Sequence, residues 1–256
     1  MQIAPGGAWV KRSAGSATPW ARLFCFPHAG GGASSFNGWR KLLPAGVELA
    51  AIQLPGCEIR EGEAPCRRLD ALIPALLSHV ASLTDLPFLF YGHSLGAIIA
   101  FDLLREMRRR QIPLGCALIV SGRRAPQLPL SHEAYGLAPE GTFANYLRLM
   151  GATPEAVLQR PHWRDRLFPT IRADLNMSDL YEYAQESPLD CPIHCFPGRD
   201  DPLVSAAEWH GWEAQTAAGF ALTELPGGHF FRAAEQAVIA GEAVARLAAA
   251  TRITGP

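Results

Sequence analysis

The feature that most constrains this chain is an abrupt change of pattern at residues 88–96. A short apolar run, Phe88-Leu-Phe-Tyr, ends in Gly92-His-Ser94-Leu-Gly96, and apolar residues at helical spacing follow directly. A strand, a sharp turn that bears a serine, and a helix make up a nucleophile elbow. A Cβ at either glycine would crowd the neighbouring strand or helix. The pattern predicts that Ser94 is a nucleophile, and a tight turn with a capping serine is the alternative.

Strands and helices alternate along most of the chain. Short apolar segments predict strands at residues 22–26, 47–54, 88–91, 116–121, 192–196 and 220–225. Segments with helical spacing of apolar residues lie between most of these strands. A closing helix is expected at residues 233–250. This alternation predicts an α/β fold in which helices cover both faces of a mostly parallel sheet.

The alternation is interrupted once, by about sixty residues that contain helical patterns and no convincing strand. We expect this segment to be a helical lid over the strand ends, where ligands bind in open α/β sheets. The predicted organisation is therefore a core of residues 20–123 and 188–251, a lid insertion at residues 124–187 and a loose N-terminal arm at residues 1–19.

Composition excludes several classes of protein. The 256 residues are 48% hydrophobic and 18% charged, so a large core is expected, and a net charge of −1 implies no nucleic-acid partner. No apolar run is long enough to cross a membrane, and the N-terminus lacks an apolar signal core. The six cysteines show no Cys-x-x-Cys spacing, and the histidines show no metal-ligand spacing. These features predict a cytoplasmic protein with reduced thiols, no membrane association and no bound metal.

A serine nucleophile needs a base and an acid, which in this fold follow it in the order serine, acid, histidine. His229 follows the last predicted strand, after two glycines that let the backbone bring it toward Ser94. Asp200 and Asp201 follow the preceding strand. Asp201 is favoured because it precedes Pro202 directly, and Asp200 remains the alternative.

An oxyanion hole needs two backbone donors. We expect one from the amide of Leu95, directly after the nucleophile, and the other from the amide of Ala29, in the glycine-rich loop after the first predicted strand. These glycines could instead serve only as a turn. A phosphate cradle is disfavoured because the loop lacks the lysine and spacing of a P-loop.

Taken together, these motifs resemble the type II (external, stand-alone) thioesterases of polyketide and nonribosomal peptide assembly lines. The likeness runs from about residue 20 to residue 231. It is carried by Phe26-Pro-His-Ala-Gly-Gly-Gly-Ala, Leu54-Pro-Gly, Gly92-His-Ser-Leu-Gly, Ser121-Gly-Arg-Arg-Ala-Pro126, Leu167-Phe-Pro-Thr-Ile-Arg-Ala-Asp174, Gly198-Arg-Asp-Asp and Gly227-Gly-His-Phe-Phe231. One departure is Cys57, where the family usually has arginine.

The resemblance implies an α/β-hydrolase fold with a helical lid and a Ser94, Asp201 and His229 triad. Members of the family hydrolyse acyl thioesters from the phosphopantetheine arm of acyl or peptidyl carrier proteins, and they need no cofactor. Two other functions share the sequence features. A serine esterase or acyltransferase would differ in the leaving group or the acceptor, and a non-catalytic binding protein would use the same scaffold without turnover.

Overall fold

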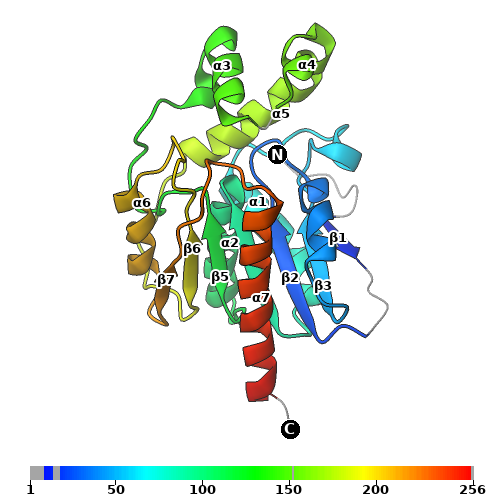
Figure 1. Cartoon of the computed structure of the whole chain (residues 1–256), viewed down its shortest axis with the longest axis vertical. Coiled ribbons are helices and arrows are strands. Elements are labelled where there is room, and N and C mark those ends of the chain that lie inside the picture. The colour runs from blue at the N-terminus through cyan, green and yellow to red at the C-terminus, as the bar shows by residue number, and fades with distance from the viewer. Residues whose placement is uncertain (1–8, 14–17, 152, 255–256) are drawn as a thin grey trace.

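A mostly parallel sheet forms the centre of the molecule in the computed structural model, which describes residues 9–13, 18–151 and 153–254 (Figure 1). Within these residues, seven strands lie in the order β1-β3-β2-β4-β5-β6-β7, and only the β1–β3 pair is antiparallel. Their bounds are β1 Val10–Ser13, β2 Ala21–Phe26, β3 Val47–Ile52, β4 Phe88–His93, β5 Leu118–Ser121, β6 Ile193–Phe196 and β7 Phe220–Leu222. The predicted α/β-hydrolase fold is confirmed.

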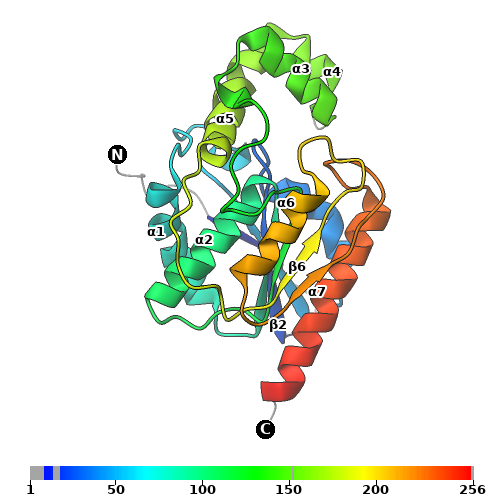
Figure 2. The same ribbon diagram turned by 90° about the vertical axis from the view of Figure 1, so that its left-hand side faces the viewer.

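Helices cover both faces of this sheet because successive strand side chains point to opposite faces. On one face, Phe24 and Phe90 pack with α1 (Leu69–Val80), α2 (Leu95–Arg109) and α6 (Ala206–His210). On the other face, Cys25 and Tyr91 pack with the 3₁₀ helix η1 (Ala33–Lys41) and with α7 (Ala233–Thr254). Figure 2 shows α1 and α2 on one side of the sheet and α7 on the other.

The segment between β5 and β6 is helical, as predicted. It contains the 3₁₀ helix η4 (Tyr135–Leu137), α3 (Glu140–Met150), α4 (Glu155–Leu158) and α5 (Pro161–Asp179), and these helices lie together at one end of the sheet (Figure 1). They share an apolar cluster of their own, which includes Phe143, Leu147 and Phe168. Ala29 and Phe230, from loops of the core, pack against that cluster. The helices therefore rest on the loops that follow the strands.

The expectation of a loose arm at residues 1–19 is wrong for its described part. Val10–Ser13 form β1, which pairs with β3 at the edge of the sheet. The segment carries Lys11 and Arg12 and shows no apolar alternation, so its strand depends on pairing with β3 and not on its own sequence. The indole of the preceding Trp9 is buried beneath the guanidinium of Arg60. Residues 1–8 and 14–17 of the arm lie outside the described residues.

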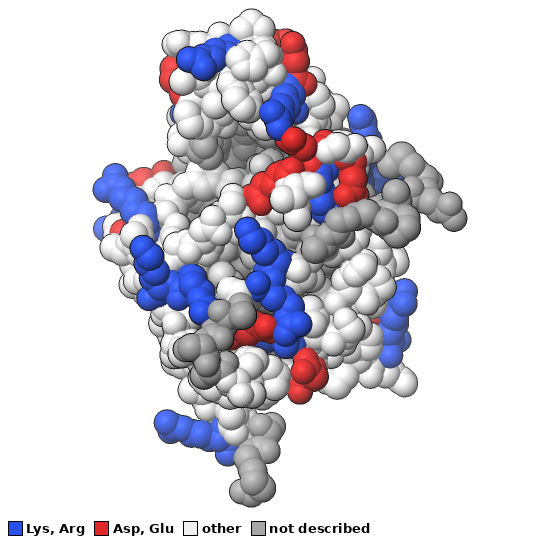
Figure 3. Space-filling model, turned by 90° about the vertical axis from the view of Figure 1, so that its right-hand side faces the viewer, with Lys and Arg blue, Asp and Glu red and all other residues white. Residues whose placement is uncertain are grey.

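The surface carries mixed charge. On the face drawn in Figure 3, lysine and arginine side chains form separate groups with acidic side chains between them. Among the described residues, the helices include none that is both long enough and apolar enough to span a membrane.

Candidate active site

Ser94 occupies the sharp turn between β4 and α2. Its backbone has φ 55° and ψ −116°, a conformation that costs free energy for a residue with a side chain. The Ser94 amide donates to the carbonyl of Ser121 at 2.8 Å, which ties the turn to the end of β5. The hydroxyl is thereby held at the N-terminus of α2, where backbone N–H groups favour developing negative charge.

The two glycines of the elbow are required by close packing of the backbone. A Cβ on Gly92 would lie 2.3 Å from the carbonyl oxygen of Gly96, and a Cβ on Gly96 would lie 2.0 Å from that of Phe26. Any larger residue would therefore push α2 away from β4 or from the loop after β2. The sequence-based explanation of both glycines is confirmed.

Asp201 and His229 form a buried pair. His229 Nδ1 lies 2.9 Å from Asp201 Oδ2, and the side chains are 4% and 1% exposed, respectively. The other carboxylate oxygen of Asp201 accepts the amide of Leu203 at 2.9 Å, which fixes the side chain. Asp200 is exposed, and its backbone amide donates to the carbonyl of Gly227 at 2.9 Å. This geometry favours Asp201 over Asp200 as the partner of the histidine.

Ser94 and His229 line the same cavity, which has a volume of about 190 Å³. The cavity lies between the loops after β2, β4 and β7 and the helices α3 to α5. Most of its wall is apolar, and it is lined by His28, Ala29, Gly30, Ser94, Tyr146, Leu147, Met150, Thr153, Pro154, Val157, Leu167, Ile171, Leu175, His229 and Phe230. Ser94 and His229 therefore both line a space suited to an apolar chain.

The two expected oxyanion donors are both available. Leu95 is the first residue of α2, so its amide has no acceptor within the helix. The amide of Ala29 donates no hydrogen bond within the described part of the chain. The amide of Gly30, next along the loop, is already bonded to the carboxylate of Asp174 at 2.8 Å. Of these two loop amides, Ala29 is the one left to bind a substrate oxygen.

Two further histidines surround the site, and sequence reasoning gave them no catalytic role. His93 is buried, its Nδ1 lies 2.8 Å from Ser121 Oγ, and its Nε2 has no hydrogen-bond partner among the described residues. Burial, with smaller effects of His229 and His28, lowers the pKa of His93 well below its ordinary value. Burial also lowers the pKa of His28 to about 4. Both imidazoles are therefore neutral at pH 7.

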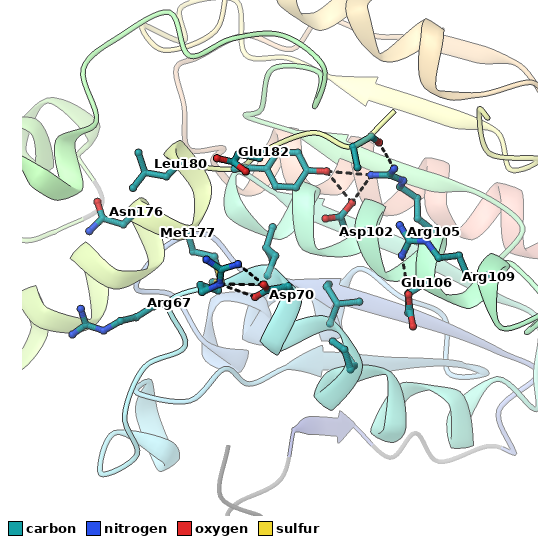
Figure 4. A pocket seen from close by; sticks show the side chains of 16 residues that line it. Arg67, Asp70, Asp102, Arg105, Glu106, Arg109, Asn176, Met177, Leu180 and Glu182 are labelled. Atoms are coloured by element: carbon teal, nitrogen blue, oxygen red, sulfur yellow. Dashed lines mark hydrogen bonds and ion pairs between the residues drawn. The ribbon is translucent and has the colours of Figure 1, made fainter. Parts of the chain in front are cut away.

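A larger cleft lies elsewhere on the molecule. Its volume is about 660 Å³, and it lies between the start of α1, the second half of α2 and the end of α5 (Figure 4). Several of its charged groups pair with one another, as Arg105 does with Asp102 and Arg109 with Glu106. Neither Ser94 nor His229 lines it, so we place the candidate site in the smaller cavity. Within the described residues, no group of three or more His, Cys, Asp or Glu side chains is arranged to hold a metal ion.

Comparison with known proteins assigns the family. A family model described as "Thioesterase domain" matches residues 21–247. The gramicidin S biosynthesis protein GrsT of Aneurinibacillus migulanus is 40% identical over 210 residues, which are 82% of this chain and 82% of GrsT. Thioesterase PikA5 of Streptomyces venezuelae is 34% identical over 231 residues, 88% of this chain and 80% of PikA5. The type II thioesterase BorB from the borrelidin biosynthetic cluster superposes with a TM-score of 0.84 at 31% identity, covering 93% of this chain and 97% of BorB. The chain belongs to the thioesterase domain family.

Proposed function

We propose that this protein hydrolyses acyl thioesters carried on the phosphopantetheine arm of acyl or peptidyl carrier proteins. The observation that carries the proposal is the hydrogen-bonded Asp201–His229 pair, whose histidine lines one apolar cavity together with Ser94. GrsT, PikA5 and BorB are named for antibiotic biosynthesis or as thioesterases, which supports an editing role in a polyketide or nonribosomal peptide assembly line.

The proposed reaction begins with attack of Ser94 Oγ on the thioester carbonyl carbon. Since His229 Nδ1 is engaged by Asp201, Nε2 is the nitrogen that takes the serine proton. The amides of Ala29 and Leu95 bind the oxyanion. The C–S bond breaks, and the leaving thiolate receives the proton from His229. Water then attacks the acyl-serine ester with the same histidine as base, which releases the carboxylic acid and restores Ser94.

Residues 124–187 would act as the lid of this site. Tyr146, Leu147 and Met150 from α3 and Val157 from α4 supply apolar wall opposite Ser94. An acyl chain attached to Ser94 would extend among these side chains and be removed from water, which favours binding by the hydrophobic effect. The pantetheine arm would enter at the mouth, so movement of α3 and α4 would gate access.

We place this activity in the cytoplasm. The six cysteines are free thiols, and all but Cys116 are buried. Unpaired cysteines are typical of proteins that work in a reducing compartment.

The test is hydrolysis of a panel of acyl-loaded carrier proteins, with the carrier's intact mass as readout and Ser94→Ala as the control. Loss of the acyl mass with wild type but not with the variant is the expected result. Acyl-CoA and oxygen esters of the same acyl groups are assayed in parallel. Faster turnover of the oxygen esters, or transfer of the acyl group to another acceptor, would contradict the proposal and indicate an esterase or acyltransferase.

A further inference from the structure

A buried carboxylate contacts the loop that carries the Ala29 amide. Asp174 lies in α5 and is 1% exposed. Its Oδ2 accepts the amide of Gly30 at 2.8 Å, across a sequence separation of 144 residues. Burying a carboxylate costs free energy unless it is hydrogen-bonded, so the bond from Gly30 offsets part of the cost of burying Asp174. The bond joins the helical segment to the loop after β2.

A second residue of α5 packs against the same loop. Gly30 has φ 73°, and a Cβ added to it would lie 2.5 Å from Ile171 Cγ1. Ile171 and Asp174 are three residues apart, so they share one face of the helix. The loop is also closed on itself by a hydrogen bond from the Gly31 amide to the His28 carbonyl at 2.9 Å. The backbone at Gly30 is therefore fixed both by packing and by a hydrogen bond.

This arrangement decides which amide of the loop is free. The carboxylate of Asp174 engages the amide of Gly30, and Ala29 and Gly30 both line the cavity with Ser94. The position of this donor affects the reaction rate strongly, because loss of one oxyanion donor lowers kcat by ~10²–10³ in subtilisin. We infer that Asp174 is a positioning residue, which holds the loop so that the Ala29 amide faces the oxyanion. The inference rests on the proposed nucleophilic role of Ser94.

The geometry also predicts which substitutions the position tolerates. The bond to Gly30 needs an acceptor and does not need a charge. Burial raises the pKa of Asp174 to about 7, and the bond from Gly30 opposes this in part. Near neutral pH, a fraction of the molecules therefore carries Asp174 in its protonated, neutral form. The amide oxygen of asparagine can accept the same bond in the same volume. Leucine has a similar shape and no acceptor.

The test compares Asp174→Asn with Asp174→Leu, using Asp165→Asn and Asp165→Leu at an exposed position of the same helix as matched controls. We expect Asp174→Leu to lower kcat by ~10- to 100-fold with KM changed less than ~2-fold, because oxyanion binding acts in the transition state. Asp174→Asn should stay within ~3-fold of wild type, and both Asp165 variants should be unchanged. Circular dichroism and thermal melts establish that each variant is folded.

A second measurement separates this inference from the proposed function. The rate at which a fluorophosphonate labels Ser94 depends on the oxyanion hole and requires no thioester substrate. Labelling should slow in Asp174→Leu and not in Asp174→Asn, whether or not the wild type cleaves acyl carriers. If the leucine variant fails to fold, Asp174→Ala takes its place with the same expectation. Wild-type labelling and turnover in a folded variant without an acceptor, or an asparagine variant as defective as leucine, would overturn the inference.

Discussion

At the scale of single residues, Ser94 is the proposed nucleophile and also has a strained backbone conformation. We expect Ser94→Ala to lose nearly all turnover, because the nucleophile is gone and triad members act as a unit. Ser94→Gly should be equally inactive but more stable than Ser94→Ala, by about 1–3 kcal/mol, because glycine adopts φ 55° without the strain that a Cβ brings there. Hydrolysis assays and chemical denaturation measure both effects. A Ser94→Ala protein with half the wild-type rate would remove Ser94 as the nucleophile.

The two adjacent acids should differ sharply. Asp201→Asn should lower kcat by ~10⁴-fold, since an amide beside His229 Nδ1 favours the wrong imidazole tautomer. Asp200→Asn should change kcat less than ~3-fold, because its side chain is exposed. Steady-state kinetics of the two variants with one acyl thioester make the comparison, and the reverse ranking would assign the acid to Asp200.

Asp174 should make stability depend on pH. Burial raises its folded-state pKa to about 7 from the ordinary value of 3.8, so between these pH values the folded protein binds the proton that the unfolded chain has lost. The contribution of Asp174 to the free energy of unfolding therefore falls as pH rises from about 4 to about 7. Its titratable neighbours are the thiols of Cys57 and Cys66, whose pKa values are raised by burial, so they stay uncharged in this range.

The measurement is denaturation of wild type and Asp174→Asn at intervals of pH from 4 to 8. The asparagine variant should gain stability relative to wild type as pH rises. A stability difference that is independent of pH would mean that Asp174 does not titrate in this range.

Parts of the candidate site that are local in the chain could be proposed from the sequence. Ser94 and Leu95 belong to one turn, Ala29 to one glycine-rich loop, and His229 and the two candidate acids follow predicted strands. The sequence favoured Asp201 and left Asp200 as the alternative, and the contact between Asp201 and His229 supports that preference. The Asp174–Gly30 bond could not be predicted, because no pattern relates residues 144 positions apart. Its sequence signal is a carboxylate at position 174, placed among apolar positions of an otherwise amphipathic helix.

At the scale of elements, α3 presents one face to the cavity and another to solvent. Leu147 is 6% exposed and lines the cavity, whereas Leu149 is 65% exposed. We expect Leu147→Trp to lower kcat/KM for an octanoyl thioester by ~10-fold relative to an acetyl thioester, because the indole fills space that the longer chain needs. Leu149→Trp is the control and should leave the ratio unchanged. A ratio unaffected by Leu147→Trp would exclude α3 from the acyl-binding wall.

The helices of the lid should differ in mobility. α5 is bonded to the core through Asp174 and through Thr170, whose hydroxyl donates to the carbonyl of Gly56 at 3.2 Å. We therefore expect amides of α3 and α4 to exchange with solvent faster than those of α5 and β4, and to slow when Ser94 carries a stable phosphonate. Hydrogen exchange read by mass spectrometry gives this ranking. Uniformly high protection of α3 and α4, unchanged by the phosphonate, would contradict gating.

Elements with their own pattern were predicted well, and elements that depend on partners were not. The strands at 22–26 and 192–196 are mostly apolar segments, and their observed bounds differ from the predicted ones by one residue. β1 was missed because Lys11 and Arg12 carry no strand pattern. The helical segment after β6 is divided into α6 and the 3₁₀ helix η5 (Gly211–Gln215), and a Cβ on Gly211 would lie 2.8 Å from the Cβ of Ala125. Tertiary packing decided both cases.

At the scale of the whole molecule, the alternation of strands and helices predicted the class of fold because it reflects burial on both faces of a sheet. The strand order was not predictable from pattern alone, because β3 crosses to the far side of β2 before β4 returns beside it. That crossing brings the loops after β2 and β4 together, and with them the Ala29 and Leu95 amides. The site therefore exists only when the central strands have paired.

The short strand β1 has a consequence for how the molecule avoids association with its own copies. It covers β3, a six-residue strand whose side chains are all buried, and presents exposed Lys11 and Arg12. Short, charged edge strands are poor templates for pairing with another chain. A protein cut back to Trp20 would leave β3 as a mostly apolar edge with unpaired N–H and C=O groups, and Glu48 would be its one charged side chain. By pairing with β3, β1 therefore covers an edge that could otherwise pair with another chain, although it lies far from Ser94 in the sequence.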